Sequence, residues 1–269
     1  MSFSATLWYV AIRENRDGIL TISFLNIGQG DAIFIESPTG MQVVIDGGPN
    51  KAIMKEITSI MPWYDRHIDM IMVTNPDKDH YEGFIPLFGR YTIGVEIEPG
   101  TVSQTEMFRT LKNIIQTKKV ATIVARRGQI IDIGGGAYIQ ILFPDRDVSG
   151  LSTNNGSIVA KLVYGETSVL LTGDSPVAIE EYLISQDKTI LDSDILKVGH
   201  HGSRTSTSDA YVQAISPAYA MISAGKDNSY GHPHKEVLDI LAKEKVPVLG
   251  TYDLGRITFV SDGKSFIRR

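Results

Sequence analysis

The feature that most constrains the fold is an apolar run, Ile68 to Val73, that stops at the polar segment Thr74-Asn75-Pro76-Asp77-Lys78-Asp79-His80. A run rich in Ile, Met and Val that ends at a proline-containing turn is typical of a buried strand followed by a loop. Alternate side chains of an extended segment point the same way, so Asn75, Asp77 and Asp79 can converge, while His80 opens the next helix. The segment therefore offers oxygen and imidazole ligands for a metal ion at a strand end.

Asn, Pro and Asp are also ordinary turn formers, so this loop alone does not distinguish a metal site from a solvated turn. Other strand-like segments, however, also end in potential ligands. Asp46 follows the segment 42–45 and precedes two glycines, and Asp174 follows a glycine after the segment 168–172. His200 and His201 follow the segment 194–198 and are flanked by glycines. Adjacent histidines at such a place are typical of ligation or proton transfer.

Two of these carboxylates also have simpler interpretations. Asp46 either caps a helix expected at 51–60 or supports the metal loop from behind. Asp174 could bridge two cations. In the simpler interpretation, either Asp174 or Ser175 is the N-cap of a helix expected at 176–185. The histidines decide in favour of a shared site, because four of the six lie in two strand-end loops and His80 lies in a third.

The remaining pattern predicts an α/β fold. Strand-like segments at 20–25, 32–36 and 42–46 suggest an antiparallel meander, and further strands are expected at 93–97, 121–124, 129–133, 137–143, 158–163 and 221–224. Additional helices are expected at 105–116 and 235–242. The glycine triplet 134–136 lies between two strand-like runs and is interpreted as a hairpin turn. Two groups of strands interleaved with helices predict two sheets packed face to face, covered by helices, with the polar strand ends along one rim.

Composition excludes several classes of site. The chain has no cysteine, which excludes disulfides, thiolate metal sites and cysteine nucleophiles. A net charge of -5 argues against nonspecific coating of nucleic acid, although a bound cation can still attract phosphate. The apolar segment 5–12 is too short to cross a bilayer. Residues 1–18 are therefore expected to be an N-terminal tail or the remnant of a membrane anchor, ahead of one domain at 19–269.

Several ordered motifs resemble those of the metallo-β-lactamase superfamily, in particular the branch typified by the hydrolase domain of ComEC, the DNA-uptake channel protein. These motifs are Phe24 to Ala32, Ile45 to Gly48, Thr74 to His80, Asn155 to Ser157, Leu171 to Asp174, Leu196 to Ser203 and Asn228 to Pro233. The resemblance extends from about Ile19 to the end of the chain. It implies a four-layered αββα sandwich, with two mixed β-sheets flanked by helices and one or two metal ions at its edge.

The resemblance also implies roles for individual residues. The metal ligands would be Asp77, Asp79, His80, Asp174 and one of His200 and His201. Asp46 would support the metal loop, and His232 would lie near the substrate. Outer contacts to the metal loops or to a phosphate are expected from Asn155, Ser203, Arg204, Lys226 and Asn228.

Position 75 departs from the superfamily motif, which has His where this chain has Asn75. An amide oxygen can coordinate a hard cation, but it binds transition metals more weakly than imidazole. One of two metal positions is then weakened or empty. A degenerate relative that binds a metal without catalysis is therefore an alternative to an enzyme.

The implied chemistry is hydrolysis. A divalent cation lowers the pKa of a coordinated water and stabilises charge on a phosphoryl or carbonyl oxygen. Asp79 is expected to orient the nucleophile, and His232 or the non-ligating member of the histidine pair to donate a proton to the leaving group. Because the ligand set is rich in carboxylates, manganese is the expected metal, with zinc as the alternative.

The sequence thus predicts a metal-dependent phosphodiesterase, specifically a nuclease acting on DNA, with single-stranded DNA as a candidate substrate. The alternative is a hydrolase of another phosphodiester or ester, such as a phosphocholine ester, which suits the acidic composition better. The chain is expected to be bacterial and not to insert stably into a membrane by itself. In a full-length form it is expected to be extracytoplasmic or tethered to a membrane; otherwise it is expected to be soluble. Its oligomeric state is not predicted.

Overall fold

Two β-sheets form the centre of the protein in the computed structural model, which describes residues 16–269. The eight-stranded sheet has the order β15-β14-β1-β2-β3-β4-β5-β6, and the seven-stranded sheet has the order β13-β12-β11-β10-β9-β8-β7. The first comprises β1 (Leu20–Phe24), β2 (Ile33–Glu36), β3 (Gln42–Ile45), β4 (His67–Met72), β5 (Thr92–Glu98), β6 (Ala121–Val124), β14 (Ile257–Ser261) and β15 (Phe266–Arg268). The second comprises β7 (Ile130–Gly134), β8 (Ala137–Phe143), β9 (Val159–Tyr164), β10 (Thr167–Leu171), β11 (Ile195–Lys197), β12 (Tyr219–Ile222) and β13 (Val248–Gly250).

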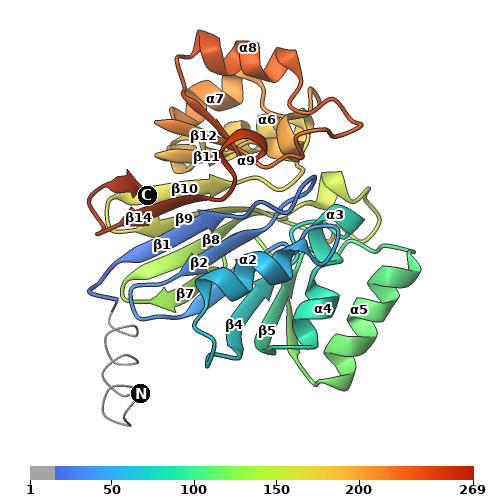
Figure 1. Ribbon diagram of the computed structural model, residues 1–269. Helices are drawn as coiled ribbons and strands as arrows, with labels where there is room; N and C mark the ends of the chain where they lie inside the picture. The colour runs from blue at the N-terminus through green and yellow to red at the C-terminus, as the bar shows by residue number, and fades with distance from the viewer. Residues whose placement is uncertain (1–15) are drawn as a thin grey trace.

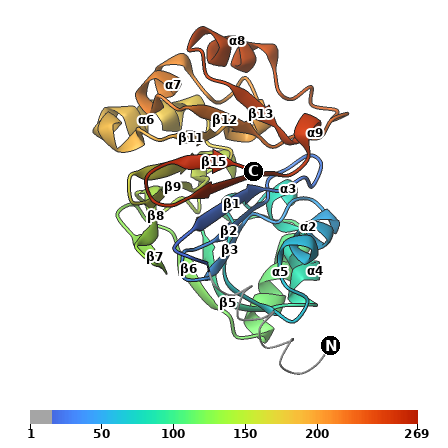
Figure 2. The ribbon, with the colours of Figure 1, turned by 60° about the vertical axis from the view of Figure 1, so that its left-hand side comes forward.

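Helices cover the outer face of each sheet, as the two ribbon views show (Figure 1, Figure 2). The eight-stranded sheet is covered by α2 (Ala52–Ile60), α4 (Phe84–Phe88) and α5 (Glu106–Thr117), and the short α3 (Lys78–Tyr81) lies at its edge. The seven-stranded sheet is covered by α6 (Val177–Asp187), α7 (Asp209–Ile215) and α8 (Lys235–Lys243), and α9 (Thr251–Leu254) follows β13. The predicted four-layered αββα sandwich is confirmed.

Three apolar layers hold the sandwich together, because alternate strand residues face opposite sides of a sheet. Met70 and Met72 of β4 face the layer between the sheets, whereas Ile71 faces the helices. In the second sheet, Val169 and Leu171 of β10 face the same central layer. Since both faces of each sheet are buried, the central strands are nearly continuous apolar runs, as the sequence showed.

Both sheets are mixed in the same way. The strands β14, β1, β2 and β3 pair antiparallel, and β3, β4, β5 and β6 pair parallel. In the other sheet, β7 to β10 pair antiparallel and β10 to β13 pair parallel. The carboxyl ends of parallel strands meet at one edge of a sheet. The loops after β3, β4, β10, β11 and β12 therefore collect on one rim of the sandwich.

Some expected elements differ from the structure. The meander at β1 to β3 and the hairpin between β7 and β8 are present as predicted. The sequence did not indicate α4, α7, α9 or the strands β13 to β15. Of these strands, β14 inserts beside β1 with Phe259 opposite Ile22. The expected N-terminal tail lies mostly outside the described residues. Within residues 16–269, no helix is both long and apolar enough to cross a bilayer.

Candidate metal centre

Asp46 fixes the loop that follows β4. Its carboxylate accepts hydrogen bonds from the backbone N–H of Thr74 at 2.8 Å and from the Thr74 hydroxyl at 2.6 Å. Oδ2 of Asp46 also lies 2.9 Å from Nδ1 of His80. The helix α2 is instead preceded by Lys51 without a side-chain cap. Asp46 therefore supports the metal loop, and its contact with Nδ1 turns Nε2 of His80 toward the interior of the site.

His201 is held in the same manner from the opposite sheet. Its Nδ1 lies 3.1 Å from the carbonyl oxygen of Ser223 and 3.2 Å from Oδ1 of Asp31. Asp31 in turn accepts a hydrogen bond of 2.8 Å from the ammonium of Lys197, and all three side chains are buried. An imidazole with its Nδ1 engaged by a carbonyl or carboxylate presents Nε2 as a metal ligand.

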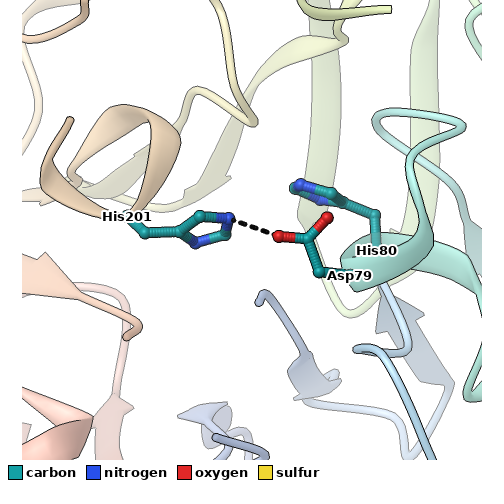
Figure 3. Close-up of side chains that lie close together, drawn as sticks. All are labelled: Asp79, His80 and His201. Atoms are coloured by element: carbon teal, nitrogen blue, oxygen red, sulfur yellow. Dashed lines mark ion pairs between the residues drawn. The ribbon is translucent and has the colours of Figure 1, made fainter. Parts of the chain in front are cut away.

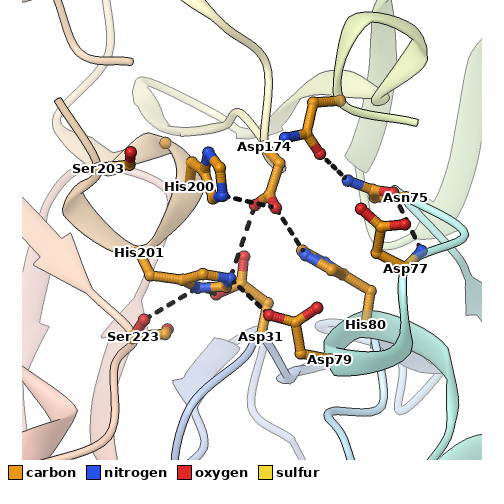
Figure 4. Close-up of polar contacts among 12 residues, drawn as sticks. Asp31, Asn75, Asp77, Asp79, His80, Asp174, His200, His201, Ser203 and Ser223 are labelled. Carbon is orange, nitrogen blue, oxygen red and sulfur yellow. Dashed lines mark hydrogen bonds and ion pairs between the residues drawn. The ribbon is translucent and has the colours of Figure 1, made fainter. Parts of the chain in front are cut away.

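Four side chains, Asp79, His80, Asp174 and His201, approach one another from three strand ends (Figure 4), and Figure 3 shows Asp79, His80 and His201 alone. Nε2 of His80 lies 3.1 Å from Oδ2 of Asp174, and Nε2 of His201 lies 3.2 Å from Oδ2 of Asp79. Nε2 of His201 is also 3.8 Å from Oδ1 of Asp174. The ligand atoms of Asp79, His80 and His201 all lie within 4.8 Å of one another, as do those of Asp31, Asp174 and His201.

Three buried atoms of the four converging side chains lack a hydrogen-bond partner: Nε2 of His80, Nε2 of His201 and Oδ1 of Asp174; Oδ1 of Asp31, behind them, also lacks one but forms ion pairs with Lys197 and His201. Buried polar atoms are almost always paired, so three unpaired atoms that face one another indicate a missing ligand. Two imidazole nitrogens and two carboxylates form a donor set that suits zinc, manganese or iron. The residues present therefore fit a divalent cation.

The electrostatics of the cluster agree with this fit. Burial by itself lowers the pKa of His201, but the carboxylates of Asp31 and Asp174 outweigh burial and raise the pKa to about 10. Burial likewise opposes protonation of His80, yet Asp174 and Asp46 raise its pKa well above the usual value. These shifts show a strongly negative potential at the two imidazoles. A divalent cation at their Nε2 atoms would compensate the same carboxylates.

Backbone conformation contributes to this placement. Asp46, His200 and His201 all have positive φ angles, of 58°, 47° and 56°. Residues other than glycine rarely adopt this conformation, which costs about 1–3 kcal/mol per residue and is concentrated at functional sites. The positive φ angles of Asp46, His200 and His201 are therefore consistent with a functional site at these residues.

Asn75 and Asp77 are engaged elsewhere. The amide of Asn75 donates to Oδ1 of Asn154 at 2.7 Å, and its Oδ1 accepts from the backbone N–H of Asp77 at 3.1 Å. Asp77 accepts a hydrogen bond of 2.8 Å from the hydroxyl of Thr153. Among residues 16–269, neither Asp77 nor His200 belongs to a group of converging ligand atoms. Asn75 and Asp77 therefore fasten the metal loop to the turn at Asn154–Gly156.

His200 lies at the side of the centre. Its Nε2 is 3.7 Å from Oδ2 of Asp174, and its Nδ1 is 3.1 Å from the hydroxyl of Thr205. The side chain is 26% exposed, whereas that of His201 is 1% exposed. The sequence left open which of the two histidines is the ligand, and the geometry favours His201.

A hollow of about 370 Å³ opens in front of the cluster. Asp79, Asp174 and His201 line its floor, while Gln29 and His232 line its wall. Gln29 accepts a hydrogen bond from the backbone N–H of Gly225, which turns its amide NH₂ toward Nδ1 of His232 at 3.4 Å. The Nε2 atom of His232 then carries the proton and remains available to a bound molecule.

The expected outer contacts are placed differently. Asn155 is exposed, and its neighbour Asn154 reaches the metal loop instead. Ser203 is buried and pairs with the hydroxyl of Thr205 at 3.0 Å. Asn228 braces its own loop, because its side chain contacts the carbonyl oxygens of Gly225 and His232. Arg204 lies 3.4 Å from Glu236, and Lys226 is exposed.

Asp31 and Lys197 were not predicted as site residues. One signal for Asp31 was available in the sequence. Like Asp46 and Asp174, Asp31 is a carboxylate beside a glycine at the start or end of a strand. Nothing in the local sequence shows that Lys197 is buried or that its partner lies far away in the chain. A lysine is almost never fully buried unless it is paired.

The close approach of Gly30 to the metal loop gives a first testable prediction. A Cβ at Gly30 would lie 2.3 Å from the carbonyl oxygen of Asp79, whereas a Cβ at Gly28 would meet nothing within 4 Å. Both glycines have positive φ angles. We expect Gly30→Ala to displace Asp79 and weaken metal binding by about 10–100-fold, the range found for outer partners of metal ligands.

The matched control is Gly28→Ala, which introduces the same methyl group at a positive φ angle without the clash. We expect Gly28→Ala to lose about 1–2 kcal/mol of stability from the left-handed backbone, and Gly30→Ala to lose more because of the added clash. Metal titration calorimetry measures the difference between them. Equal metal affinity in the two variants would contradict the proposed role of the contact.

Comparison with curated sequences identifies relatives of the chain. It is 30% identical over 261 residues to ComE operon protein 3 of Bacillus subtilis, a match that covers 88% of this chain and 32% of that protein. It is 30% identical over 248 residues to Recombination protein 2 of Haemophilus influenzae, covering 90% of this chain and 29% of the relative. The chain thus spans about a third of the length of these relatives. No protein-family model matches it.

Solved structures share the fold at low sequence identity. Zn²⁺-bound PqqB from Methylobacterium extorquens has a TM-score of 0.56 at 13% identity, over 89% of this chain and 99% of that one. A putative metal-dependent hydrolase from Parabacteroides distasonis has a TM-score of 0.53 at 16% identity, over 89% and 96%. The sequence relatives show that the chain belongs to the family of ComEC-type competence proteins, and the solved structures show that it has the metallo-β-lactamase fold.

Proposed function

We propose that this protein is a metal-dependent phosphodiesterase that cleaves DNA. The observation that carries the proposal is the convergence of two unpaired imidazole nitrogens and two carboxylates on the floor of an open hollow. The hollow leaves room for a substrate directly beside the ligand atoms. Support for DNA comes from the names of two relatives, Recombination protein 2 of Haemophilus influenzae and Competence protein ComA of Neisseria gonorrhoeae, because recombination and competence both involve DNA.

A divalent cation at this centre would lower the pKa of a coordinated water and stabilise negative charge on a phosphoryl oxygen. Side chains of the protein would orient the attacking water and hold the metal ligands in place. Asp79 and Asp174 reach the centre from opposite sheets and would orient the attacking water by accepting its hydrogen bonds. Asp46 and Asp31 hold the two imidazoles in place from behind.

His232 faces the hollow from the wall. Burial is the largest of the effects that lower its pKa to about 4, and the neighbouring His201 and His200 act in the same direction. At neutral pH the ring is therefore uncharged. We propose that His232 positions the substrate by donating a hydrogen bond from Nε2, instead of transferring a proton to the leaving group as the sequence suggested.

The proposal is tested with chromogenic phosphodiesters, single-stranded DNA and carboxylic esters, each assayed in added manganese and in added zinc. We expect turnover of the phosphodiesters and of DNA, lost in the presence of a chelator. Turnover of choline-type phosphodiesters or esters without DNA cleavage would favour the alternative substrate, which the net charge of -5 suits. No turnover with any metal would show a non-catalytic binding protein.

We further propose that the centre holds one cation instead of two. The ligand atoms of Asp79, His80 and His201 lie within 4.8 Å of one another, and Asp174 lies 3.1 Å from His80, while the groups that would complete a second site are occupied or distant. Asn75 turns its amide to Asn154, and Asp77 accepts a hydrogen bond from Thr153. His200 is left with one near carboxylate, Asp174.

The change Asn75→His tests the cation number. An imidazole at this position can join Asp77 and His200 around a second ion, so we expect the metal content to rise from about one per chain toward two. The control Asn75→Ala removes the amide without adding a ligand and should leave the content near one. Mass spectrometry of the purified proteins gives the metal content. Two ions in the unmodified protein would contradict the one-cation proposal.

A further inference from the structure

A second hollow adjoins the candidate centre. It has a volume of about 360 Å³ and shares Gln29, Lys78, Asp79 and Tyr230 with the first hollow. Its remaining walls come from the loop after β1, including Ile27, and from Pro49 and Asn50. Both volumes fall in the range of about 300–1,000 Å³ that is usual for small-molecule sites. The two hollows form one groove that leads away from the metal ligands.

An aromatic side chain stands between the two hollows. Tyr230 is 65% exposed, although aromatic residues are usually buried for their large apolar area. Its ring lies parallel to that of His232, with centroids 5.6 Å apart and an angle of 19° between the planes. His232 covers one face of the phenol ring, which leaves the opposite face for another planar group.

The loop holds Tyr230 in this position. Oδ1 of Asn228 accepts hydrogen bonds from the backbone N–H groups of Tyr230, at 3.1 Å, and His232, at 2.9 Å. The Asn228 amide donates to the carbonyl oxygens of Gly225 and His232. All the hydrogen-bonding capacity of Asn228 is spent on shaping this loop. The backbone that carries Tyr230 is thus held in place and its ring stacks on His232, which reduces the entropy lost when a ligand stacks on the ring.

We propose that Tyr230 and the second hollow bind the nucleobase next to the scissile phosphate. This inference rests on the proposed phosphodiesterase function and names the part of the substrate that the groove recognises. A base can stack on the free face of Tyr230 and contact Ile27 and Pro49. The phosphate then lies over the metal ligands, beside the ammonium of Lys78, which is 69% exposed and 3.4 Å from Glu82.

Charge gives an independent reason to expect stacking. Contacts with phosphates normally supply much of the affinity for nucleic acids. This chain has a net charge of -5, and Lys78 is the only lysine or arginine among the residues, all of them described, that line the two hollows. Aromatic stacking does not depend on a basic surface and is tolerant of base identity. A stacking site therefore suits a nuclease of acidic composition that cleaves many sequences.

Equilibrium binding of two short oligonucleotides tests the proposal. One is phosphorothioate tetrathymidylate, which resists hydrolysis, and the other is an abasic oligonucleotide with the same linkages and charge. We expect the manganese-loaded protein to bind the thymidylate about tenfold or more tightly, since loss of one stacked base commonly has an effect of this size. Tyr230→Ala should abolish the difference, and Tyr230→Phe should retain it.

The matched control is Trp63→Ala, because Trp63 is also a highly exposed aromatic residue, 72% exposed, but lies before the start of β4, at the opposite edge of the sheet. This variant should leave the preference for thymidylate unchanged. Equal binding of both oligonucleotides by the unmodified protein, no binding of either, or an unchanged preference in Tyr230→Ala would each overturn the proposal. Base-dependent binding without DNA cleavage would refute the phosphodiesterase function and leave the stacking site intact.

Discussion

Replacing Asp174 with alanine is expected to remove the bound cation and with it hydrolysis. Among residues 16–269, Asp174 is the one carboxylate that lies near His80, His200 and His201 together, at 3.1, 3.7 and 3.8 Å. Changes in outer partners of metal ligands commonly reduce affinity 10–100-fold, so loss of a direct ligand should exceed about 100-fold. Metal titration calorimetry and phosphodiester hydrolysis measure the two effects.

The control for this experiment is Asp227→Ala. Asp227 is an exposed carboxylate in the loop between β12 and α8, and its replacement removes the same charge from the protein. We expect this variant to bind metal like the unmodified protein. If Asp174→Ala retained full metal affinity while remaining folded, the centre would have been assigned to the wrong residues.

The second large effect is expected at Lys197, which acts on the centre through Asp31. The side chains of Lys197 and Asp31 are 1% and 3% exposed. Burial raises the pKa of Asp31, but the ammonium of Lys197 and the neighbouring His201 outweigh burial and hold this pKa below its usual range. Lys197→Met keeps the side-chain length but leaves a buried carboxylate without its main counter-charge. Breaking a buried pair in this way typically costs about 3–5 kcal/mol.

Urea unfolding of the metal-free protein measures the loss in the free energy of unfolding. The double variant Lys197→Met, Asp31→Asn tests whether the unpaired carboxylate of Asp31 causes this loss. We expect the amide to recover a large part of the stability, because it removes the unpaired charge. Metal affinity should remain reduced in the double variant, since Nδ1 of His201 loses its carboxylate partner. A stability loss below about 1 kcal/mol in Lys197→Met would contradict the proposed pairing, as would a double variant no more stable than the single one.

The layered fold was predictable because its determinants are local. Apolar strands that end in glycine and polar residues occur in both halves of the chain, and their spacing shows where loops must lie. The pairing of β14 with β1 was not predictable. Ile257–Ser261 is an ordinary strand sequence, and its partner lies at the other end of the domain. Which distant strand it joins depends on the assembled sheet.

The candidate site was predictable as a set of loops but not as a set of contacts. Asp79, His80 and Asp174 follow from strand ends, whereas the choice of His201 over His200 depends on positive φ angles and on the position of Ser223. Asn75 could be interpreted from sequence as a weakened ligand. Its pairing with Asn154 becomes visible only when the turn at Asn154–Gly156 is placed against the metal loop.

The most direct test of the account is anomalous X-ray scattering from crystals of the protein grown with manganese. The account predicts one peak, bounded by Asp79, His80, Asp174 and His201 and within about 2.0–2.3 Å of both Nε2 atoms. A peak coordinated by other residues would contradict the assignment. The absence of any peak at this point under saturating manganese, and again under saturating zinc, would contradict the central claim that these side chains form a metal centre.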